Sequence, residues 1–498
     1  MRFPLIPTLL VLSFVCLAQG IDFHANKLWT LSDRDYTTPA NWPEFSEAYQ
    51  TNKFNHFDPT ETRTYQQRYF QSSKFFDEKN GPIFVYICGE YTCEVPTTRM
   101  FPYAMAEEHQ AMYYVVEHRY YGKSQLFEDW SVPNMKLLTA EQALADLAYF
   151  IEMKQAELAT KYGTTERRKV ITVGGSYPGA LSAWFRLKYP HVTDGSLSSS
   201  GVVHPILDFW KFDARINESL RLTPGCWEAA GKIFSHVYDH LTSFQPGKRE
   251  EILKTFGAGE HYDTNDFMVY LNGIIVEQVQ YGTRTQLCDS IVAHANPKDM
   301  QSQLENFVNL GGPAGADGVS AVQSTKIDFQ ASGRQWNWQI CTNMGWLFTP
   351  SSKSVLTPAT LDLDYWVGYC DRVFGVKMDP KAGIDHFNLM FGREHLRGSN
   401  IFFTNGVEDG WQFAGHRVDT HHNTSMTSHV VDCENCAHCV DLYTEKASDA
   451  QDLKDTRKRI RLHVAAWIQG DGFPENSGAK NFKSGDDMPE PYMATIAE

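Results

Sequence analysis

Three residues in this chain have the types and the chain order of a catalytic triad. Ser176 lies in the run GGSYPG, Asp409 follows in NGVEDGW, and His438 lies further on in a cysteine-rich run. A serine hydroxyl is a weak nucleophile, so it needs a general base, and the base needs an acid to orient it. The order serine, acid, histidine is that of hydrolases built on a parallel sheet. We therefore predict Ser176 as nucleophile, Asp409 as orienting acid and His438 as general base.

The residues around Ser176 predict the local structure that would expose it. Val170–Val173 is a short apolar run typical of a buried strand, and Ala180–Tyr189 has helical character and ends before Pro190. A strand, a glycine-flanked turn and a helix form a nucleophile elbow, whose helix N-terminus offers free N–H groups to an oxyanion. Pro178 replaces the usual glycine, and proline is tolerated in the first turn of a helix. The alternative is an ordinary strand-to-helix turn.

Asp409 and His438 each have a simpler interpretation. A turn aspartate commonly satisfies its own backbone, and one histidine among 18 means little by itself. The spacing of Cys433, Cys436, His438 and Cys439 also resembles a zinc site, which would remove His438 from a triad. We favour disulfides over zinc because the chain has the features of an exported protein, described next.

The N-terminus has the features of a secretory signal peptide, residues 1–20. Arg2 precedes an apolar stretch that ends in the small-residue site Ala18-Gln19-Gly20. We therefore expect a protein of the secretory pathway, secreted or lysosomal, with no membrane span. Two sequons, at Asn217 and Asn423, are then candidate glycosylation sites. The net charge of −15 argues against nucleic acid as a partner.

Alternating apolar runs and helical patterns predict an α/β fold with a doubly wound, mostly parallel sheet. Thr64–Phe70 reads as an antiparallel edge strand, and 139–158 as a helix. Strand signals become sparse after residue 206 and resume near residue 400. We divide the chain into a signal peptide (1–20), a first core part (21–206), a helical insertion (207–395), a second core part (396–476) and a polar tail (477–498).

Nine cysteines remain after removal of the signal peptide, so at least one is unpaired or bonded to another chain. Four of them fall in the insertion and are expected to make two disulfides there: Cys226, Cys288, Cys341 and Cys370. The other five flank the predicted site, and we expect pairing among them to hold its rim: Cys88, Cys93, Cys433, Cys436 and Cys439. The connectivity stays open.

Several motifs resemble the prolyl carboxypeptidase and dipeptidyl peptidase II family of serine exopeptidases, and most of all its thymus-specific serine protease branch. The matching runs span most of the mature chain: QRYF (67–70), EHRYYG (117–122), GGSYPG (174–179), WNWQICT (336–342), NGVEDGW (405–411) and AHCVDL (437–442). Gly410 and the residues around Gly89 depart from the family pattern. QRYF and EHRYYG are the most specific of these motifs.

The resemblance implies an α/β-hydrolase core with a helical cap and cleavage of peptides near a terminus, commonly after proline or a small residue. It implies the triad above, with oxyanion donors at Tyr177 and near Gly89. Glu90 would pair with a substrate amino terminus or be an exposed loop acid. Trp411 and Trp336 would wall a proline pocket or pack in the core. No cofactor or metal is implied; the partner is a peptide substrate, and a homodimer stays open.

Two other functions remain alternatives to an exopeptidase. The changed residues around Gly89 and Gly410 favour a catalytically inactive hydrolase-fold binding protein. An esterase could use the same triad, although the family motifs argue against it. Labelling of Ser176 by a fluorophosphonate and comparison of peptide with ester substrates would separate the three.

Overall fold

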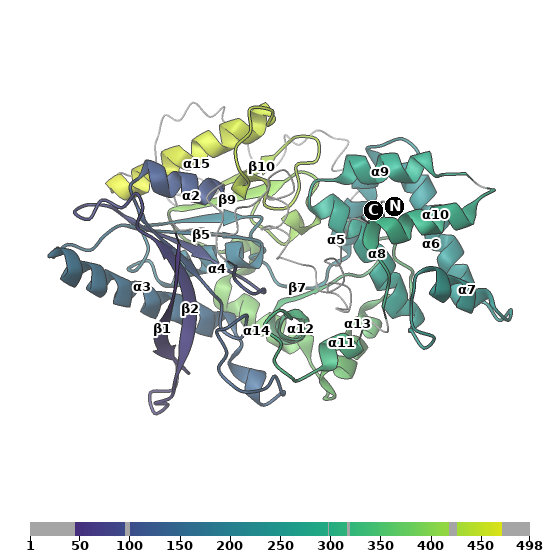
Figure 1. Ribbon diagram of the computed structural model, residues 1–498, viewed down its shortest axis with the longest axis horizontal. Helices are drawn as coiled ribbons and strands as arrows, with labels where there is room; N and C mark the ends of the chain where they lie inside the picture. The colour runs from purple at the N-terminus through teal and green to yellow at the C-terminus, as the bar shows by residue number, and fades with distance from the viewer. Residues whose placement is uncertain (1–44, 95–99, 297, 316–318, 418–425, 471–498) are drawn as a thin grey trace, which may run out of the picture.

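The computed structural model describes residues 45–94, 100–296, 298–315, 319–417 and 426–470, so the signal peptide, the polar tail and Asn423 lie outside the described residues. Its centre is an eight-stranded sheet in the order β1-β2-β4-β3-β5-β6-β9-β10 (Figure 1). β1, β2 and β4 are joined by antiparallel pairing, and all other neighbours run parallel. The strands are β1 (Ser46–Lys53), β2 (Thr64–Ser72), β3 (Ile83–Ile87), β4 (Met112–Val116), β5 (Val170–Gly175), β6 (Gly195–Ser199), β9 (Ile401–Gly406) and β10 (Met426–Val431).

The prediction that Thr64–Phe70 forms the edge of the sheet was wrong. β2 covers the expected residues, but β1 pairs with its outer side and forms the edge of the sheet. The sequence of β1, SEAYQTNK, is largely polar, and its two buried side chains are Gln50 and Asn52. Asn52 donates a hydrogen bond to Gln67 of β2, at 2.8 Å. An apolar pattern therefore could not reveal this strand.

Helices cover both faces of the sheet, which suits the continuous apolar sequences of its parallel strands (Figure 1). Helices α2 (Phe101–Glu108) and α15 (Gln451–Gln469) lie on one face, and α3 (Ala140–Tyr162) and α4 (Tyr177–Lys188) on the other. The Thr139 hydroxyl caps α3 by accepting the Gln142 N–H. A mostly parallel sheet of this order, with helices on both faces, confirms the predicted α/β-hydrolase fold.

The segment between β6 and β9 is mostly helical. It contains β7 (Ile206–Asp208), α5 (Trp210–Arg221), α6 (Cys226–Leu241), α7 (Lys248–Thr255), α8 (Thr264–Gln280), α9 (Arg284–Ala293), α10 (Met300–Gly311), α11 (Ser320–Gln323), α12 (Gly333–Gln339), η2 (Ile340–Met344), β8 (Gly345–Leu347), α13 (Leu363–Phe374), α14 (Pro380–Phe391) and η3 (Arg393–His395). In Figure 1, α5 to α10 form the half of the molecule opposite the sheet. α14 instead packs on α4, where Phe387 and Phe391 contact Trp184.

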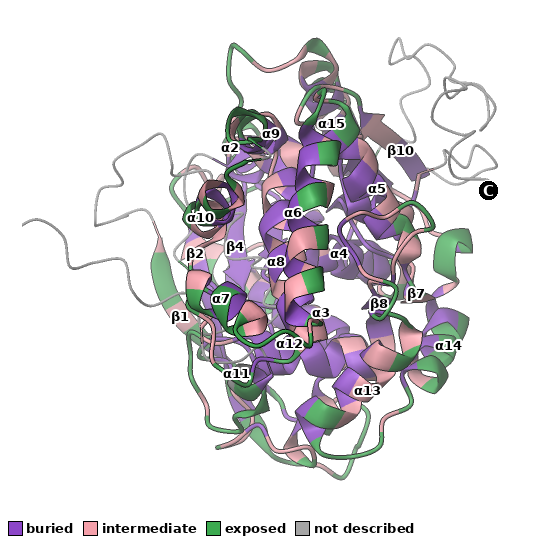
Figure 2. Cartoon of the chain, turned by 90° about the vertical axis from the view of Figure 1, so that its right-hand side faces the viewer, coloured by how far each residue is buried: buried purple, intermediate pink, exposed green. Residues whose placement is uncertain are grey.

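The helical half has its own packed interior. Figure 2 shows α6 presenting an exposed stripe while its other side faces inward. The inward side chains of α6 include Ile233, Phe234 and Val237, all at most 2% exposed. Two disulfides link helices of this segment, Cys226–Cys288 and Cys341–Cys370. The four cysteines of the insertion therefore make two disulfides, as predicted. Among the described helices, none is long and apolar enough to cross a bilayer.

Candidate active site

Ser176 lies on a sharp turn between β5 and α4. Its backbone has φ 64° and ψ −132°, a region that a residue with a Cβ rarely adopts. Its N–H donates to the Ser199 carbonyl oxygen of β6, at 2.8 Å, which anchors the turn to the end of the sheet. α4 begins at Tyr177, earlier than predicted, so Pro178 falls in its first turn as expected. The local geometry is that of a nucleophile elbow.

Asp409 and His438 form a buried pair. Asp409 is the N-cap of η4 (Gly410–Phe413), and its Oδ1 accepts the Trp411 backbone N–H at 2.9 Å. Its Oδ2 lies 2.7 Å from Nδ1 of His438. An acceptor at Nδ1 places the proton there and leaves Nε2 as a proton acceptor. Burial lowers the pKa of His438, but the charges of Asp409 and Cys439 and the hydrogen bonds to both together hold that pKa well above the usual 6.5.

The segment 432–443, which we call the histidine loop, packs against the elbow. The Cys439 N–H donates to the Ser200 hydroxyl at 2.9 Å, and a Cβ on Gly175 would lie 2.8 Å from the Cys439 sulfur. The structure therefore brings Ser176 and His438 to the same end of the sheet. Among the described residues, no hydrogen bond joins Ser176 Oγ to His438, and such bonds often tighten only when substrate binds.

The two predicted oxyanion residues belong to neighbouring segments, the first turn of α4 and the loop after β3. Tyr177 is the first residue of the helix, so its N–H has no acceptor within the helix. The Gly89 backbone approaches Pro178 so closely that a Cβ there would lie 2.4 Å from the proline Cγ. The Tyr177 side chain is buried, and its hydroxyl bonds to Gln339 at 2.8 Å and His118 at 3.1 Å.

Glu90 is 5% exposed, so the alternative of an exposed loop acid does not hold. Burial raises the pKa of the Tyr177 hydroxyl, and the nearby charge of Glu90 adds to that rise. Burial also raises the pKa of Tyr281, at the end of α8, again with a contribution from Glu90. Burial lowers the pKa of His118 to about 4, so this neighbour of Tyr177 stays uncharged near neutral pH. Glu90 thus places a carboxyl group close to the elbow.

Trp336 and Trp411 belong to one row of rings that joins the elbow to the histidine loop. Trp336 lies 5.6 Å from Tyr177 and 6.0 Å from Trp346, measured between ring centroids. Trp346 lies 5.7 Å from Trp411, which in turn lies 6.3 Å from His438. Both predicted tryptophans are buried, so packing and substrate contact are compatible roles for each.

Sequence reasoning missed Gln280, the last residue of α8. Its side-chain oxygen accepts the Trp411 indole N–H at 3.0 Å, and its backbone oxygen accepts the His438 N–H at 2.9 Å. Arg284 of α9 also forms a buried ion pair, at 2.6 Å, with Glu408 beside Asp409. Helices of the insertion therefore hold both the acid and the base. No sequence signal marks these residues, because their partners lie far along the chain.

The cysteines near the site make two disulfides, Cys88–Cys93 and Cys433–Cys436. Cys439 is left as a buried free thiol, which accounts for the odd cysteine. The zinc alternative therefore loses two of its proposed ligands, because sulfurs joined in a disulfide do not bind a metal as thiolates.

The structure argues against Asn217 as a glycosylation site. Asn217 is 2% exposed on α5. Its amide nitrogen donates to the Asp213 carbonyl at 3.0 Å, and its side-chain oxygen accepts from Trp227 at 3.0 Å. A glycan on that nitrogen would break these bonds and open the helical interior. A local sequon cannot reveal that the folded chain covers it.

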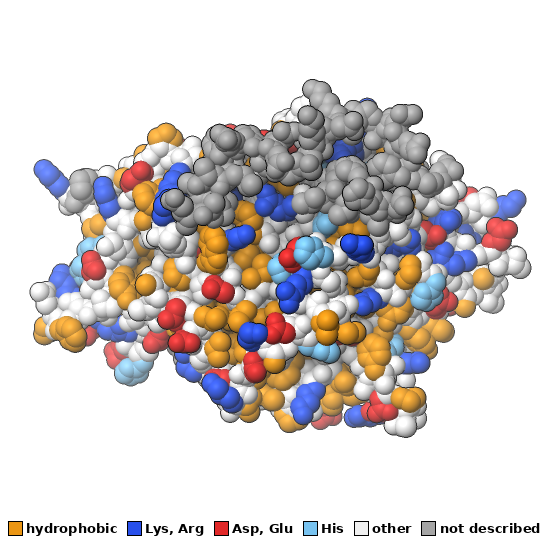
Figure 3. All heavy atoms as spheres, turned by 180° about the vertical axis from the view of Figure 1, so that it is seen from behind, with side chains coloured by type: hydrophobic (Ala, Val, Ile, Leu, Met, Phe, Trp, Pro, Cys, Tyr) orange, Lys and Arg blue, Asp and Glu red, His pale blue; other side chains and the backbone are white. Residues whose placement is uncertain are grey.

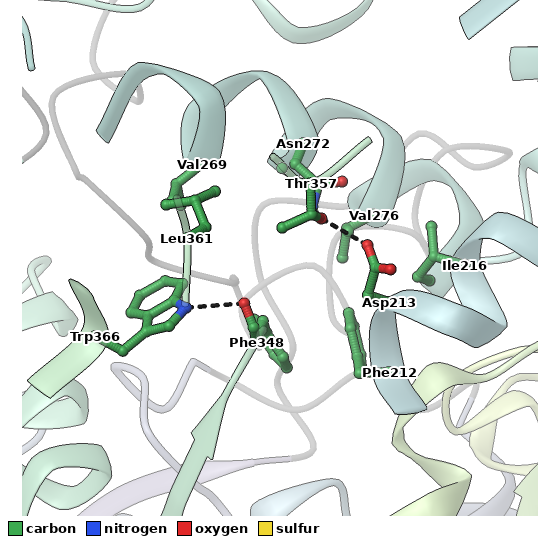
Figure 4. Close-up of a pocket in the computed structure, with 11 residues that line it drawn as sticks. Phe212, Asp213, Ile216, Val269, Asn272, Val276, Phe348, Thr357, Leu361 and Trp366 are labelled. Carbon is green, nitrogen blue, oxygen red and sulfur yellow. Dashed lines mark hydrogen bonds between the residues drawn. The ribbon is translucent and has the colours of Figure 1, made fainter. Parts of the chain in front are cut away.

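A cavity in the helical half lies behind the row of rings (Figure 4). Phe212 and Phe348 stack at 4.2 Å and separate the cavity from Trp411, at 5.0 and 5.3 Å. Asp213 contributes a carboxyl group to the lining of this cavity. This group accepts hydrogen bonds from three hydroxyls, those of Ser351, Ser354 and Thr357. Figure 4 shows the Thr357 bond. Because Asp213 is satisfied by these hydroxyls, we assign the cavity a packing role.

The face seen from behind carries lysine, arginine, aspartate and glutamate side chains interspersed with apolar ones (Figure 3). No single sign of charge dominates the described part of that face.

Comparison with known proteins supports the motif resemblance. Residues 52–460 match the family model described as serine carboxypeptidase S28. The probable serine protease EDA2 of Arabidopsis thaliana is 31% identical over 445 residues, covering 85% of this chain and 88% of that one. The human thymus-specific serine protease is 26% identical (83% and 85% covered). The mouse lysosomal Pro-X carboxypeptidase is 28% identical (86% and 90% covered).

Proposed function

This chain belongs to the serine carboxypeptidase S28 family of serine peptidases, and from that premise we propose that it is an exopeptidase with the triad Ser176, His438 and Asp409. The observation that carries the proposal is the buried His438–Asp409 pair, joined at 2.7 Å beside a strained serine turn. This arrangement provides a nucleophile, a base and an acid that holds Nδ1 of the base, which directs Nε2 to the role of proton acceptor.

The proposed reaction proceeds through an acyl-enzyme. His438 Nε2 takes the Ser176 proton as Oγ attacks the peptide carbonyl, and the N–H groups of Tyr177 and Gly89 receive the oxyanion. The imidazolium then gives its proton to the leaving amine, and water releases the acyl group by the reverse sequence. Asp409 accepts a hydrogen bond from the Nδ1 proton and stabilises the imidazolium throughout. These steps need no group beyond the chain's own residues and water.

The helical segment 207–395 is proposed to restrict access to this site. Its residues Gln280 and Arg284 contact the histidine and acid loops directly. A cap that closes one side of the cleft would admit a chain end and exclude folded protein. Trp336 and Trp411 would pack on a proline or another small residue, since apolar rings suit the pyrrolidine. The disulfides and lysosomal relatives support a secretory-pathway location, secreted or lysosomal.

Fluorophosphonate labelling tests this function. We expect the glycosylated, processed protein to be labelled at Ser176 and the Ser176→Ala variant to remain unlabelled, because only an activated serine reacts. Mass measurement of the labelled peptide identifies the residue. A folded wild-type protein that fails to label from about pH 4 to about pH 8 would contradict the proposal and favour the inactive binding protein. Labelling with hydrolysis of esters but not of prolyl peptides would favour the esterase.

Glu90 is proposed to bind the substrate's amino terminus. We expect Glu90→Gln to raise KM for a proline-containing peptide with a free amino end by about 10- to 100-fold, because a charged hydrogen bond is lost. The N-acetylated form of the same peptide should show no such change, and kcat should change little. Steady-state kinetics on the two peptides provide the measurement.

Glu94→Gln is the matched control, because Glu94 lies on the same loop and is exposed. Equal effects of Glu90→Gln on free and acetylated peptides would contradict an amine-binding role. The masses of the products show which end is trimmed. Release of a residue from the carboxyl end would instead match the activity that gives the Pro-X carboxypeptidase relatives their name.

A further inference from the structure

The end of β6 contacts three parts of the proposed site, namely Ser176, the first turn of α4 and the histidine loop. Its serine run, Ser198–Ser200, continues one residue past the strand. The Ser198 hydroxyl donates to the Gly179 carbonyl of α4 at 2.8 Å. The Ser199 carbonyl accepts the Ser176 N–H. The Ser199 hydroxyl donates to Asp441 at 2.5 Å. The Ser200 hydroxyl accepts the Cys439 N–H. The nucleophile and the histidine loop are thus fixed to one short segment.

Asp441 is a buried acid that the proposed reaction does not use. It lies in η5 (Val440–Leu442), three residues after His438, and is 1% exposed. Its Oδ1 accepts the Ser199 hydroxyl, whereas its Oδ2 has no hydrogen-bond partner among the described residues. The Thr404 hydroxyl, on β9, is also buried without a partner among them. Because Thr404 and Ser199 are paired in register, their neighbouring hydroxyls face the same acid.

No described cation neutralises this carboxyl group. The charge of Arg457 on α15 acts on it, but forms no ion pair with it. The Arg457 guanidinium donates instead to the Asp441, Val440 and Tyr443 carbonyl oxygens and to the Asp449 carboxylate. From α2, Phe101 faces Arg457, and Glu108 pairs with Arg461 instead. The sheet contributes hydroxyls alone. The loop itself contributes the Cys439 thiol, the Tyr443 phenol and His438, which is bonded to Asp409.

We propose that Asp441 is a positioning residue that ties the histidine loop to the serine run at the end of β6 as a neutral carboxylic acid. The neutral acid accepts from Ser199 through one oxygen and donates from the other to Thr404, so both buried groups are satisfied. The ionised form would be a buried charge without an ion-pair partner among the described residues, which is costly. The inference rests on the proposed triad, because the loop it fixes carries His438.

The environment of Asp441 favours the protonated form. Burial raises the pKa of Asp441 above its usual 3.8, although the Ser199 and Thr404 hydroxyls and Arg457 oppose the rise. Since the folded-state pKa lies above the unfolded one, the acid stabilises the fold below the unfolded pKa, and this stabilisation is lost as pH rises through the folded pKa. The tie between loop and sheet is therefore expected to weaken as pH rises through the folded-state pKa of Asp441.

The test is Asp441→Asn, which keeps the shape of the neutral acid at every pH. The rate of fluorophosphonate labelling is measured for variant and wild type across the same pH range. Their ratio removes the titration of His438, which both share. We expect the ratio of the variant rate to the wild-type rate to rise as pH increases, by about threefold or more between the lowest and the highest pH at which the wild type labels. Asp213→Asn is the control, since Asp213 is another buried acid whose pKa burial raises but lies in the helical half.

The outcomes separate this inference from the proposed function. A constant or falling ratio for a folded Asp441→Asn protein, or a rise equal to that of Asp213→Asn, overturns the positioning role alone. Absence of wild-type labelling overturns the triad and the positioning role with it. Melting temperatures at each pH show whether the variants are folded. If Asp441→Asn does not fold, Ser199→Ala provides the second variant. Slower labelling that is most marked at low pH supports the tie, and an unchanged rate or an equal slowing at every pH overturns it.

Discussion

Asp409→Asn is expected to lower the rate of Ser176 labelling, and kcat for peptides, by about 10,000-fold without unfolding the protein. The reason lies in the two partners of this carboxyl group. The Trp411 N–H, at 2.9 Å, requires an oxygen at the Oδ1 position. The amide nitrogen of asparagine would then face His438 Nδ1, which lies 2.7 Å from Oδ2 in the native chain. An N–H donor there moves the imidazole proton to Nε2, where it blocks uptake of the serine proton.

Asp432→Asn is the matched control for this substitution. Asp432 is exposed at the start of the histidine loop, so its change removes one charge from the same region without altering the triad. We expect its labelling rate to stay within about twofold of wild type. A labelling rate that falls equally in both variants would indicate a general charge effect. Wild-type labelling by a folded Asp409→Asn protein would mean that another group orients His438.

The parts of this fold that depend on local sequence were predictable. The elbow follows from an apolar strand, two glycines and a helix within about 20 residues, and its serine adopts the expected strained turn. Helix α3 follows from apolar spacing and the Thr139 cap. Even here the boundaries shifted, because Tyr177 and Pro178 enter the helix that apolar spacing alone would start later.

The parts that depend on distant contacts could not be predicted. Gln280 holds the backbone of His438 across more than 150 residues, and Ser199 bonds to Asp441 across 242. Neither residue has a pattern of its own, because a single polar side chain is common in any helix or strand. Asn217 shows the converse error, since a local sequon suggested an exposed residue and the tertiary fold buries it. A single sequence therefore indicates the reacting residues better than the groups that position them.

Pro178, which stands where a nucleophile elbow usually has glycine, leads to the second large effect. Gly89→Ala is expected to slow Ser176 labelling by about 100- to 1,000-fold, the loss typical of a displaced oxyanion donor. The added Cβ would lie 2.4 Å from Cγ and 2.7 Å from Cδ of Pro178. A proline ring in the first turn of a buried helix cannot rotate away, so the loop that carries Gly89 must move instead. Labelling rates of the folded variant provide the measurement.

Pro178→Gly identifies the cause, because it removes the two ring atoms that the new Cβ would strike. The single Pro178→Gly variant should label at close to the wild-type rate, since the glycine is common at this place in an elbow. The double variant, Gly89→Ala with Pro178→Gly, should then recover most of the lost rate. Non-additivity of this kind is the expected signature of two residues in contact. If the double variant stays as slow as Gly89→Ala, the close approach of Gly89 to Pro178 is not what places the oxyanion donor. If Gly89→Ala labels normally, Gly89 is not a donor position, and Tyr177 must act with another N–H.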